Sequence, residues 1–451
     1  MDSRTSSTQT KVPRPRWVLH LQAQMWRFLM SIGMLLHKFA PPRPPKPSFS
    51  RTIQSTISTK PGEFVLHFYV PKDYEVERQL GFKNRRKSLA VNPDLEEGKA
   101  GRPVIMGEGV GVKKAEGAAP KSRSKGGYPV LINFHGGGFT LGTATDDARW
   151  CGTVVTECEA VVVSVEYRLA PECPFPTAVE DGVDAVLWVA EHAEELGIDS
   201  DKIALSGFSS GANMAFTVPI RLYDHLTGFS RATTRDGIDS AQGSTANLHG
   251  RVEEGTATES GPSSSSSTTA SASAFSMPLK PTATASVETQ LNVSICAIVP
   301  WYPPTDYTQT REQRRSTCVR ADQELPSLFT DLFDESYLHP PDSIPLSSPY
   351  LSPGIASTEL LRAALPQNIF MFTCEWDMLL AEGIKMKERL EGEVGKSVVY
   401  RMIEGVPHGW DKAPNPIKPT PGVKEHYLFA CKQLGKVWNV RSGRRQSRLV
   451  R

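Results

Sequence analysis

The sequence lacks three features that would each indicate a particular class of protein. Its 51 basic and 49 acidic residues leave a formal net charge of +2, which gives no case for nucleic acid or an acidic substrate. Its seven cysteines include no Cys-x-x-Cys pair, which argues against a zinc site or a disulfide scaffold and fits a reducing compartment. Its longest apolar stretch, residues 28–36, falls short of the roughly 18–20 residues that a membrane span needs. We therefore expect a cytoplasmic globular protein that binds neither nucleic acid nor a structural metal.

The N-terminal segment, residues 1–47, is expected to stand apart from the main domain. Apolar residues recur at helical spacing over residues 17–39, which predicts one amphipathic helix, and a stiff proline-rich linker follows at residues 41–47. We favour a helix packed over the functional site as part of a cap. The alternatives are contact with a membrane surface, which the flanking Arg and Lys residues would suit, and, less favoured because of its length, a true anchor.

Three later segments lack the apolar pattern of a buried core. Residues 76–127 are basic and glycine-rich, and residues 222–290 contain a Ser/Thr/Ala run, so both are expected to be disordered surface insertions. Residues 302–350 hold many prolines and short helical stretches, which suit part of a cap. The remainder of residues 48–437 is expected to form one large domain, followed by a basic tail at residues 438–451.

In that large domain, short strand-like runs alternate with helical segments. Such alternation predicts an α/β fold with a mostly parallel, doubly wound sheet covered by helices on both faces. In sheets of this kind the reactive residues gather at the carboxyl ends of the strands. The expected strands lie within residues 52–70 and at residues 130–134, 160–165, 202–206, 293–299, 368–373 and 398–403.

A Gly-x-Ser-x-Gly turn at residues 207–211 connects a short apolar run to a helix-prone segment. Glycines two positions before and after Ser209 keep Cβ atoms out of a tight turn, so the serine can be held in a strained conformation with its Oγ exposed. The following N–H, that of Ser210, would lie at a helix N-terminus beside any oxyanion formed there. The turn therefore marks Ser209 as a candidate nucleophile.

A second motif, His135 followed by three glycines and Phe139, comes directly after the strand expected at residues 130–134. Three glycines allow the backbone to approach a ligand closely, with successive N–H groups converging on an anion. By composition this run is rarer than the serine turn, so it is the more specific of the two signals.

A candidate acid and a candidate base follow two later strands. Asp377 lies just past the strand at residues 368–373, and His408 lies in a Gly-flanked loop past the last strand. The order Ser, Asp, His fits a triad in which the histidine takes the serine proton and the aspartate fixes its tautomer. Among ten histidines only His408 follows both partners and also lies in a Gly-flanked loop past a final strand. Glu375 and Glu382 compete for the acid role, and structural ion pairing is the alternative interpretation of those two.

Together these motifs resemble the hormone-sensitive-lipase branch of the α/β-hydrolases, and most of all its microbial and fungal carboxylesterases. The resemblance covers roughly residues 52–75, 128–221 and 291–437. It is carried by His-Gly-Gly-Gly-Phe at 135–139, Tyr-Arg-Leu-Ala-Pro-Glu at 167–172 with Phe175, Pro176 and Asp181, the serine turn, Asp377-Met-Leu with Glu382-Gly383, and His408-Gly409.

The resemblance implies an α/β-hydrolase fold with a helical cap and an enzyme that needs no cofactor. It places the oxyanion hole at Gly137 and Gly138, joined by the N–H of Ser210. The residues that it assigns to support of the glycine loop, rather than to chemistry, are His135, Arg168, Glu172 and Asp181.

Two positions depart from the family pattern. Phe208 and Ser210 stand where the family usually has an acidic residue and an alanine. Because the oxyanion hole uses a backbone N–H, Ser210 is not expected to abolish it. Family members often carry an aromatic residue after the last His-Gly, so Trp410 is expected to form a pocket wall.

The leading hypothesis is a serine hydrolase that cleaves carboxylic esters of short or medium acyl groups through a Ser-His-Asp triad and an acyl-enzyme. An amidase such as an arylformamidase is the first alternative, because such enzymes use a similar glycine loop. A non-catalytic small-molecule receptor on a hydrolase fold is less favoured, because all three triad positions are filled. The expected partner is a small-molecule ester, and the oligomeric state is not indicated.

Overall fold

The computed structural model describes residues 13–75, 78, 127–229, 293–412 and 420–439. Residues 227–292 form a unit separate from the rest of the chain, and nearly all of them lie outside the described residues. The expected insertion at residues 76–127 and the basic tail also lie almost entirely outside them. Apart from the start of the second insertion, the boundaries proposed for these segments stay predictions.

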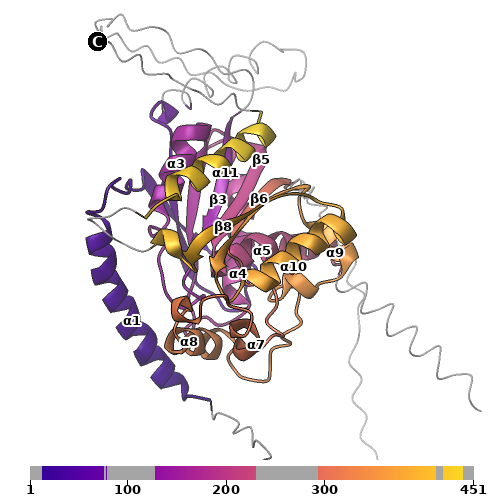
Figure 1. The fold of residues 1–451 in the computed structure, drawn as a ribbon. Coiled ribbons are helices and arrows are strands. Elements are labelled where there is room, and N and C mark those ends of the chain that lie inside the picture. The colour runs from indigo at the N-terminus through magenta and orange to yellow at the C-terminus, as the bar shows by residue number, and fades with distance from the viewer. Residues whose placement is uncertain (1–12, 76–77, 79–126, 230–292, 413–419, 440–451) are drawn as a thin grey trace, which may run out of the picture. The chain divides into compact units, whose positions relative to one another are not determined.

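The described residues contain one sheet of eight strands (Figure 1). Its central strands are rich in Val, Ile, Leu and Phe and are buried on both faces, as parallel strands between two helical layers must be. The strands are β1 (Phe49–Gln54), β2 (Glu63–Tyr69), β3 (Tyr128–Phe134), β4 (Val161–Glu166), β5 (Ile198–Phe208), β6 (Ile295–Trp301), β7 (Asn368–Trp376) and β8 (Ser397–Pro407).

The strand order is β1-β2-β4-β3-β5-β6-β7-β8. Strand β2 is antiparallel to both of its neighbours, and β3 to β8 are parallel. The carboxyl ends of those six strands therefore meet at one edge. The pairing of Phe134 on β3 with Gly207 on β5 sets the glycine loop directly beside the serine turn.

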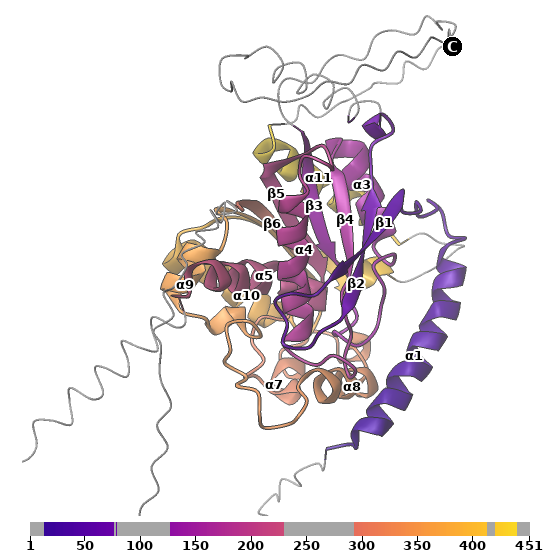
Figure 2. The ribbon, with the colours of Figure 1, turned by 180° about the vertical axis from the view of Figure 1, so that it is seen from behind.

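Helices cover both faces of the sheet. Helices α3 and α11 lie in front of it in Figure 1, and α4 and α5 lie in front of it in the reverse view of Figure 2. The helices are α1 (Arg16–His37), α3 (Ala148–Cys158), α4 (Thr177–Glu191), α5 (Ser210–Thr227), α7 (Arg311–Arg315), α8 (Ser327–Tyr337), α9 (Thr358–Ala364), α10 (Leu380–Arg389) and α11 (Val423–Val437). Short helical turns occur at Ala321–Gln323, Pro353–Ile355, Leu390–Val394 and Trp410–Lys412.

The doubly wound α/β fold is confirmed, and the expected start of the second insertion was wrong. Helix α5 continues to Thr227, so the second insertion cannot begin at residue 222; Leu222 is buried and belongs to the helix. Asp181 lies inside α4, which begins at Thr177 directly after Pro176. No helix among the described residues has both the length and the hydropathy needed to cross a membrane.

Candidate active site

The serine turn has the geometry that its glycines predict. Strand β5 ends at Phe208, α5 begins at Ser210, and Ser209 between them has a φ of 54°. A Cβ atom at Gly207 would collide with the carbonyl of Gly211, and a Cβ atom at Gly211 would collide with the carbonyl of Phe134. The close contact between β3, β5 and α5 therefore requires glycine at both positions.

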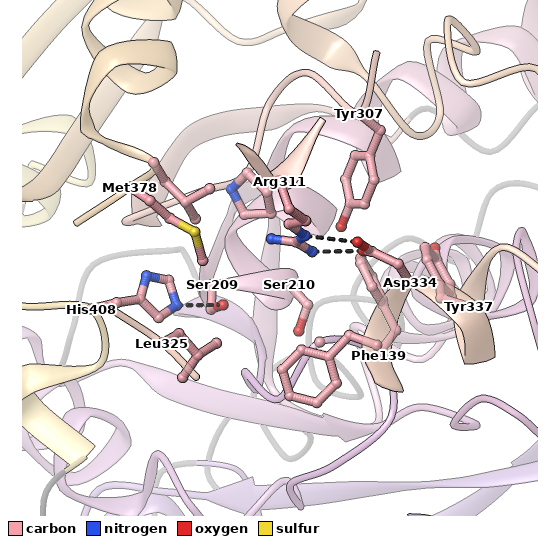
Figure 3. A pocket seen from close by; sticks show the side chains of 14 residues that line it. Phe139, Ser209, Ser210, Tyr307, Arg311, Leu325, Asp334, Tyr337, Met378 and His408 are labelled. Atoms are coloured by element: carbon pink, nitrogen blue, oxygen red, sulfur yellow. Dashed lines mark hydrogen bonds and ion pairs between the residues drawn. The ribbon is translucent and has the colours of Figure 1, made fainter. Parts of the chain in front are cut away.

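Ser209, His408 and Asp377 form one hydrogen-bonded chain. The Nε2 atom of His408 lies 2.8 Å from Ser209 Oγ, as Figure 3 shows, and its Nδ1 atom lies 2.7 Å from Asp377 Oδ2. The carboxylate is buried, and its Oδ1 atom accepts a hydrogen bond of 2.9 Å from the Leu379 N–H. This second bond fixes the carboxylate, so the histidine is held with Nε2 directed at the serine.

The two competing acids have other partners. Glu375 is more exposed, and its Oε2 atom accepts a hydrogen bond of 2.6 Å from the Gly405 N–H. Glu382 forms a buried ion pair of 2.8 Å with Arg314 and accepts a bond of 2.6 Å from the Thr305 N–H. Burial raises the pKa of Glu382 to about 6, against the attraction of Arg314. Of the three candidates, Asp377 is the acid that contacts His408.

The glycine loop has a backbone conformation that favours glycine. Gly137 and Gly138 have φ values of 121° and 60°, in the left-handed range that favours glycine. In the described part of the chain, no backbone carbonyl accepts the N–H of Gly137, Gly138 or Ser210. Gly138 and Ser210 line a pocket together with Ser209 and His408.

Two side chains that sequence reasoning did not single out hold this loop. The Tyr167 hydroxyl donates a bond of 2.8 Å to the carbonyl of His135, and the two rings stack with their centroids 4.2 Å apart. Arg27 of α1 donates a bond of 2.9 Å to the carbonyl of Thr140. Tyr167 stands in the quoted motif at residues 167–172, whereas Arg27 lies more than a hundred residues away from the loop in sequence and carries no motif.

The group predicted to support the loop divides into two parts. Arg168 and Asp181 bind each other at 2.6 Å, and Arg168 also donates a bond of 2.7 Å to the carbonyl of Lys60, so this pair holds the β1–β2 turn. Glu172 instead accepts two bonds of 2.9 Å from Arg27. Among the described residues, Glu172 reaches the loop through Arg27, whereas Arg168 and Asp181 bind each other and the β1–β2 turn. The supporting role predicted for Arg168 and Asp181 stays a prediction.

The pocket has aromatic and aliphatic walls with one ion pair among them (Figure 3). Helix α8 supplies Phe333, against which any Cβ atom at Gly138 would collide. Trp410 does not line this pocket; it is buried with its ring 5.6 Å from that of His426, so its predicted role as a pocket wall was wrong. The apolar and aromatic lining residues are Phe139, Pro304, Tyr307, Leu325, Phe333, Tyr337, Met378 and Leu379.

A buried charge cluster lies under the site. The Nζ atom of Lys412 lies 2.6 Å from Asp147, 2.9 Å from Asp411 and 3.3 Å from the centre of the Phe208 ring. Burial acts to lower the pKa of Lys412, but attraction to the two carboxylates outweighs it and raises the pKa. The Tyr302 hydroxyl donates to Asp411. Phe208 thus belongs to an aromatic and cationic cluster that links the serine turn to the loop carrying His408.

We expect Lys412→Met to lower the free energy of unfolding by about 3 kcal/mol, because it leaves two buried carboxylates without their cation. Thermal and urea unfolding would measure the change. The matched control is Lys387→Met, which breaks a surface pair with Glu391 and is expected to change stability far less, because water screens exposed charges. Equal changes in the two variants would contradict the role given to the cluster.

A mostly parallel sheet of eight strands, with a serine on a strand–helix turn and a histidine–carboxylate pair bonded to it, is the arrangement of the α/β-hydrolases. The family model described as "alpha/beta hydrolase fold" matches residues 131–232 and 280–412, more than half of the chain. The chain belongs to this family.

Individual relatives match over shorter stretches. Esterase LipI of Mycobacterium tuberculosis is 44% identical over 96 residues, which are 21% of this chain and 30% of the relative. Human hormone-sensitive lipase is 39% identical over 103 residues, which are 23% of this chain and 9% of the relative. The chain thus spans a third or less of the length of these two relatives, and the predicted likeness to the hormone-sensitive-lipase branch is confirmed.

A solved structure of ester hydrolase EH1AB1, from the metagenome of Lake Arreo, superposes with a TM-score of 0.57. The two sequences are 19% identical, and the alignment covers 94% of this chain and 93% of the other. At this identity the likeness supports the fold alone.

Proposed function

We propose that the protein is a serine carboxylesterase that works through an acyl-enzyme and needs no cofactor. The observation that carries this proposal is the continuous chain of hydrogen bonds from Ser209 through His408 to Asp377, at 2.8 and 2.7 Å. Relatives named as esterases and lipases support the same class of substrate. A small-molecule ester is therefore the expected partner.

In the first half of the proposed reaction, Ser209 Oγ forms a bond to the ester carbonyl carbon while its proton passes to His408 Nε2. The carbonyl oxygen becomes an oxyanion, which the N–H groups of Gly137, Gly138 and Ser210 would stabilise. Asp377 stabilises the imidazolium. When the carbon–oxygen bond to the alcohol breaks, the alcohol leaves with the proton from His408.

In the second half, water replaces the alcohol. It gives a proton to His408 Nε2 as it attacks the acyl carbon, and the same oxyanion contacts are used again. Collapse of this intermediate breaks the bond to Ser209 Oγ, which recovers its proton from His408. The acid product leaves, and the enzyme returns to its starting protonation state.

The pocket walls favour short or medium acyl groups. Phe333 packs against Gly138, and Phe139 stacks on Tyr337 with ring centroids 3.8 Å apart, so aromatic rings crowd the space beside the glycine loop. We expect p-nitrophenyl esters to be hydrolysed fastest between acetate and hexanoate, with kcat/KM for palmitate at least about tenfold lower. A preference for palmitate would contradict this assignment.

The amidase alternative predicts a different result with the same esters. Inactivity on every ester, with turnover of aryl formamides, would favour that alternative.

One ion pair in the pocket points to a polar group on the substrate. Arg311 binds Asp334 through Nε and Nη2 at 2.7 and 2.6 Å, which leaves Nη1 outside the pair. In Figure 3 the guanidinium lies between Ser209 and Asp334. A half-buried charged donor at this place would favour esters that carry a hydroxyl or carbonyl oxygen within its reach.

We therefore expect Arg311→Met to lower kcat/KM about 10- to 100-fold for esters with such an oxygen, in their acyl or alcohol half, and much less for otherwise identical esters without it. The matched control is Arg51→Met, which breaks the pair between Arg51 and Glu195 outside the pocket. An equal loss on both kinds of ester would contradict substrate recognition by Arg311.

A further inference from the structure

Helix α1 presents its apolar face to solvent. Six of its large apolar side chains, including one just past its end, are 49–69% exposed. On the helix they recur at intervals of three, four or seven residues, so they lie on one face. Figures 1 and 2 both show α1 along the margin of the domain. We call this face the exposed stripe, and it consists of Trp17, Leu21, Phe28, Ile32, Leu35 and Phe39.

The opposite face of α1 holds the helix on the domain. At about 100° per residue, Leu19, Ala23 and Arg27 lie on the side away from the stripe. Leu19 and Ala23 are buried, and Arg27 forms the pair with Glu172 at 2.9 Å. Trp26 packs against Phe329 of α8, with ring centroids 4.7 Å apart. A surface helix ordinarily turns its apolar face to the core, and this one is fixed with that face outward.

The charged residues of the stretch that carries the stripe are all basic, and the acids beside it, Glu172 and Glu335, are paired with Arg27 and Arg14. No Asp or Glu occurs between Ser3 and Gly62. Basic residues flank both ends of the helix, and those that follow it are exposed. A second copy of this protein would bring the same acid-free segment against the stripe, so like charges would oppose self-association. The flanking basic residues are Arg14, Arg16, Lys38, Arg43 and Lys46.

We propose that α1 is a docking helix for an anionic lipid bilayer. Its 22 residues give a length of about 33 Å, and the helix lies in the plane of the interface with the exposed stripe inserted among the lipid chains. The exposed basic residues after the helix, Lys38, Arg43 and Lys46, contact the anionic headgroups. The contact is peripheral, since α1 does not qualify as a membrane span. This inference goes beyond ester hydrolysis and does not depend on it.

Flotation of the full-length protein with vesicles tests this inference. The vesicles contain phosphatidylcholine alone or phosphatidylcholine with 30% phosphatidylserine. The variant Leu21→Glu/Phe28→Glu/Ile32→Glu changes the stripe. The matched control, Val319→Glu/Leu346→Glu/Ile355→Glu, adds the same charge at exposed apolar positions elsewhere. Thermal unfolding of all three proteins checks that they are folded.

Wild type and the control are expected to float with the anionic vesicles, and the stripe variant is expected to bind at least about tenfold more weakly. Binding of wild type should also fall when NaCl is raised from 50 to 500 mM. The proposal is overturned if wild type stays unbound on anionic vesicles, or if the stripe variant binds as well as the control. A dimer of wild type that the stripe variant abolishes, without vesicle binding, would assign the stripe to a second copy instead.

Discussion

Replacing Ser209 with alanine is expected to lower kcat for p-nitrophenyl acetate by about 10⁴- to 10⁶-fold. The substitution removes the atom that forms the acyl bond, while Gly207, Gly211 and the strained turn that they permit remain in place. The protein should therefore fold normally and still bind the ester. The loss should appear in kcat, because the missing interaction is made only along the reaction path.

Two measurements distinguish the loss of the nucleophile from misfolding of the variant. Thermal unfolding should place the variant within a few degrees of wild type, and a fluorophosphonate probe should label wild type but not Ser209→Ala. Ser316→Ala, on the surface beside α7, is a handling control with an expected change of less than about twofold. Retention of more than 1% of wild-type activity in Ser209→Ala would show that another group is the nucleophile.

Much of this site could be predicted because its parts are local in sequence. Each of the serine turn, the glycine loop and the His408 loop follows a strand, and a parallel sheet brings such strand ends to one edge. Ser209 and His408 are 199 positions apart, yet the sheet topology alone brings them into contact. The acid of the triad was harder to predict from the sequence, because Glu375 lies only two positions from Asp377. The direction of each side chain decides between them: Asp377 contacts His408, and Glu375 contacts the backbone of Gly405.

The parts that could not be predicted depend on long-range packing of side chains. The link between Arg27 and Glu172 spans 145 positions and has no motif at its N-terminal end. No motif in the sequence marks Lys412, and its role becomes clear only from its contacts with Asp147 and with the aromatic ring of Phe208. Phe208, a departure from the family pattern, is explained by that cluster rather than by the chemistry.

The N-terminal helix shows a different limit of sequence reasoning. Apolar periodicity over residues 17–39 predicts that one face of a helix is apolar, and the structure has α1 at Arg16–His37. Periodicity does not say what covers that face. None of the residues of α1 lines the described pocket, although the helix touches α8, which does. Its role as part of a cap stays a prediction.

Replacing Asp377 with asparagine is expected to lower kcat by about 10⁴-fold with little change in KM. Asparagine keeps the size of the side chain but removes the negative charge beside Nδ1 of His408. The imidazolium formed during the reaction then loses its stabilising partner, and an amide that donates to Nδ1 would hold the ring in the wrong tautomer. Steady-state kinetics with p-nitrophenyl acetate would measure the loss.

Glu375→Gln is the matched control for this substitution, because it makes the same change from acid to amide two positions away. Glu375 contacts the backbone of Gly405 rather than His408, so its loss should change kcat by less than about threefold. Glu382→Gln is not a suitable control, since it would leave Arg314 buried without its partner and act through stability. If Glu375→Gln lost as much activity as Asp377→Asn, the bond between Asp377 and His408 would not define the acid of the triad. A large loss confined to Asp377→Asn, with both variants equally stable, would assign that role to Asp377.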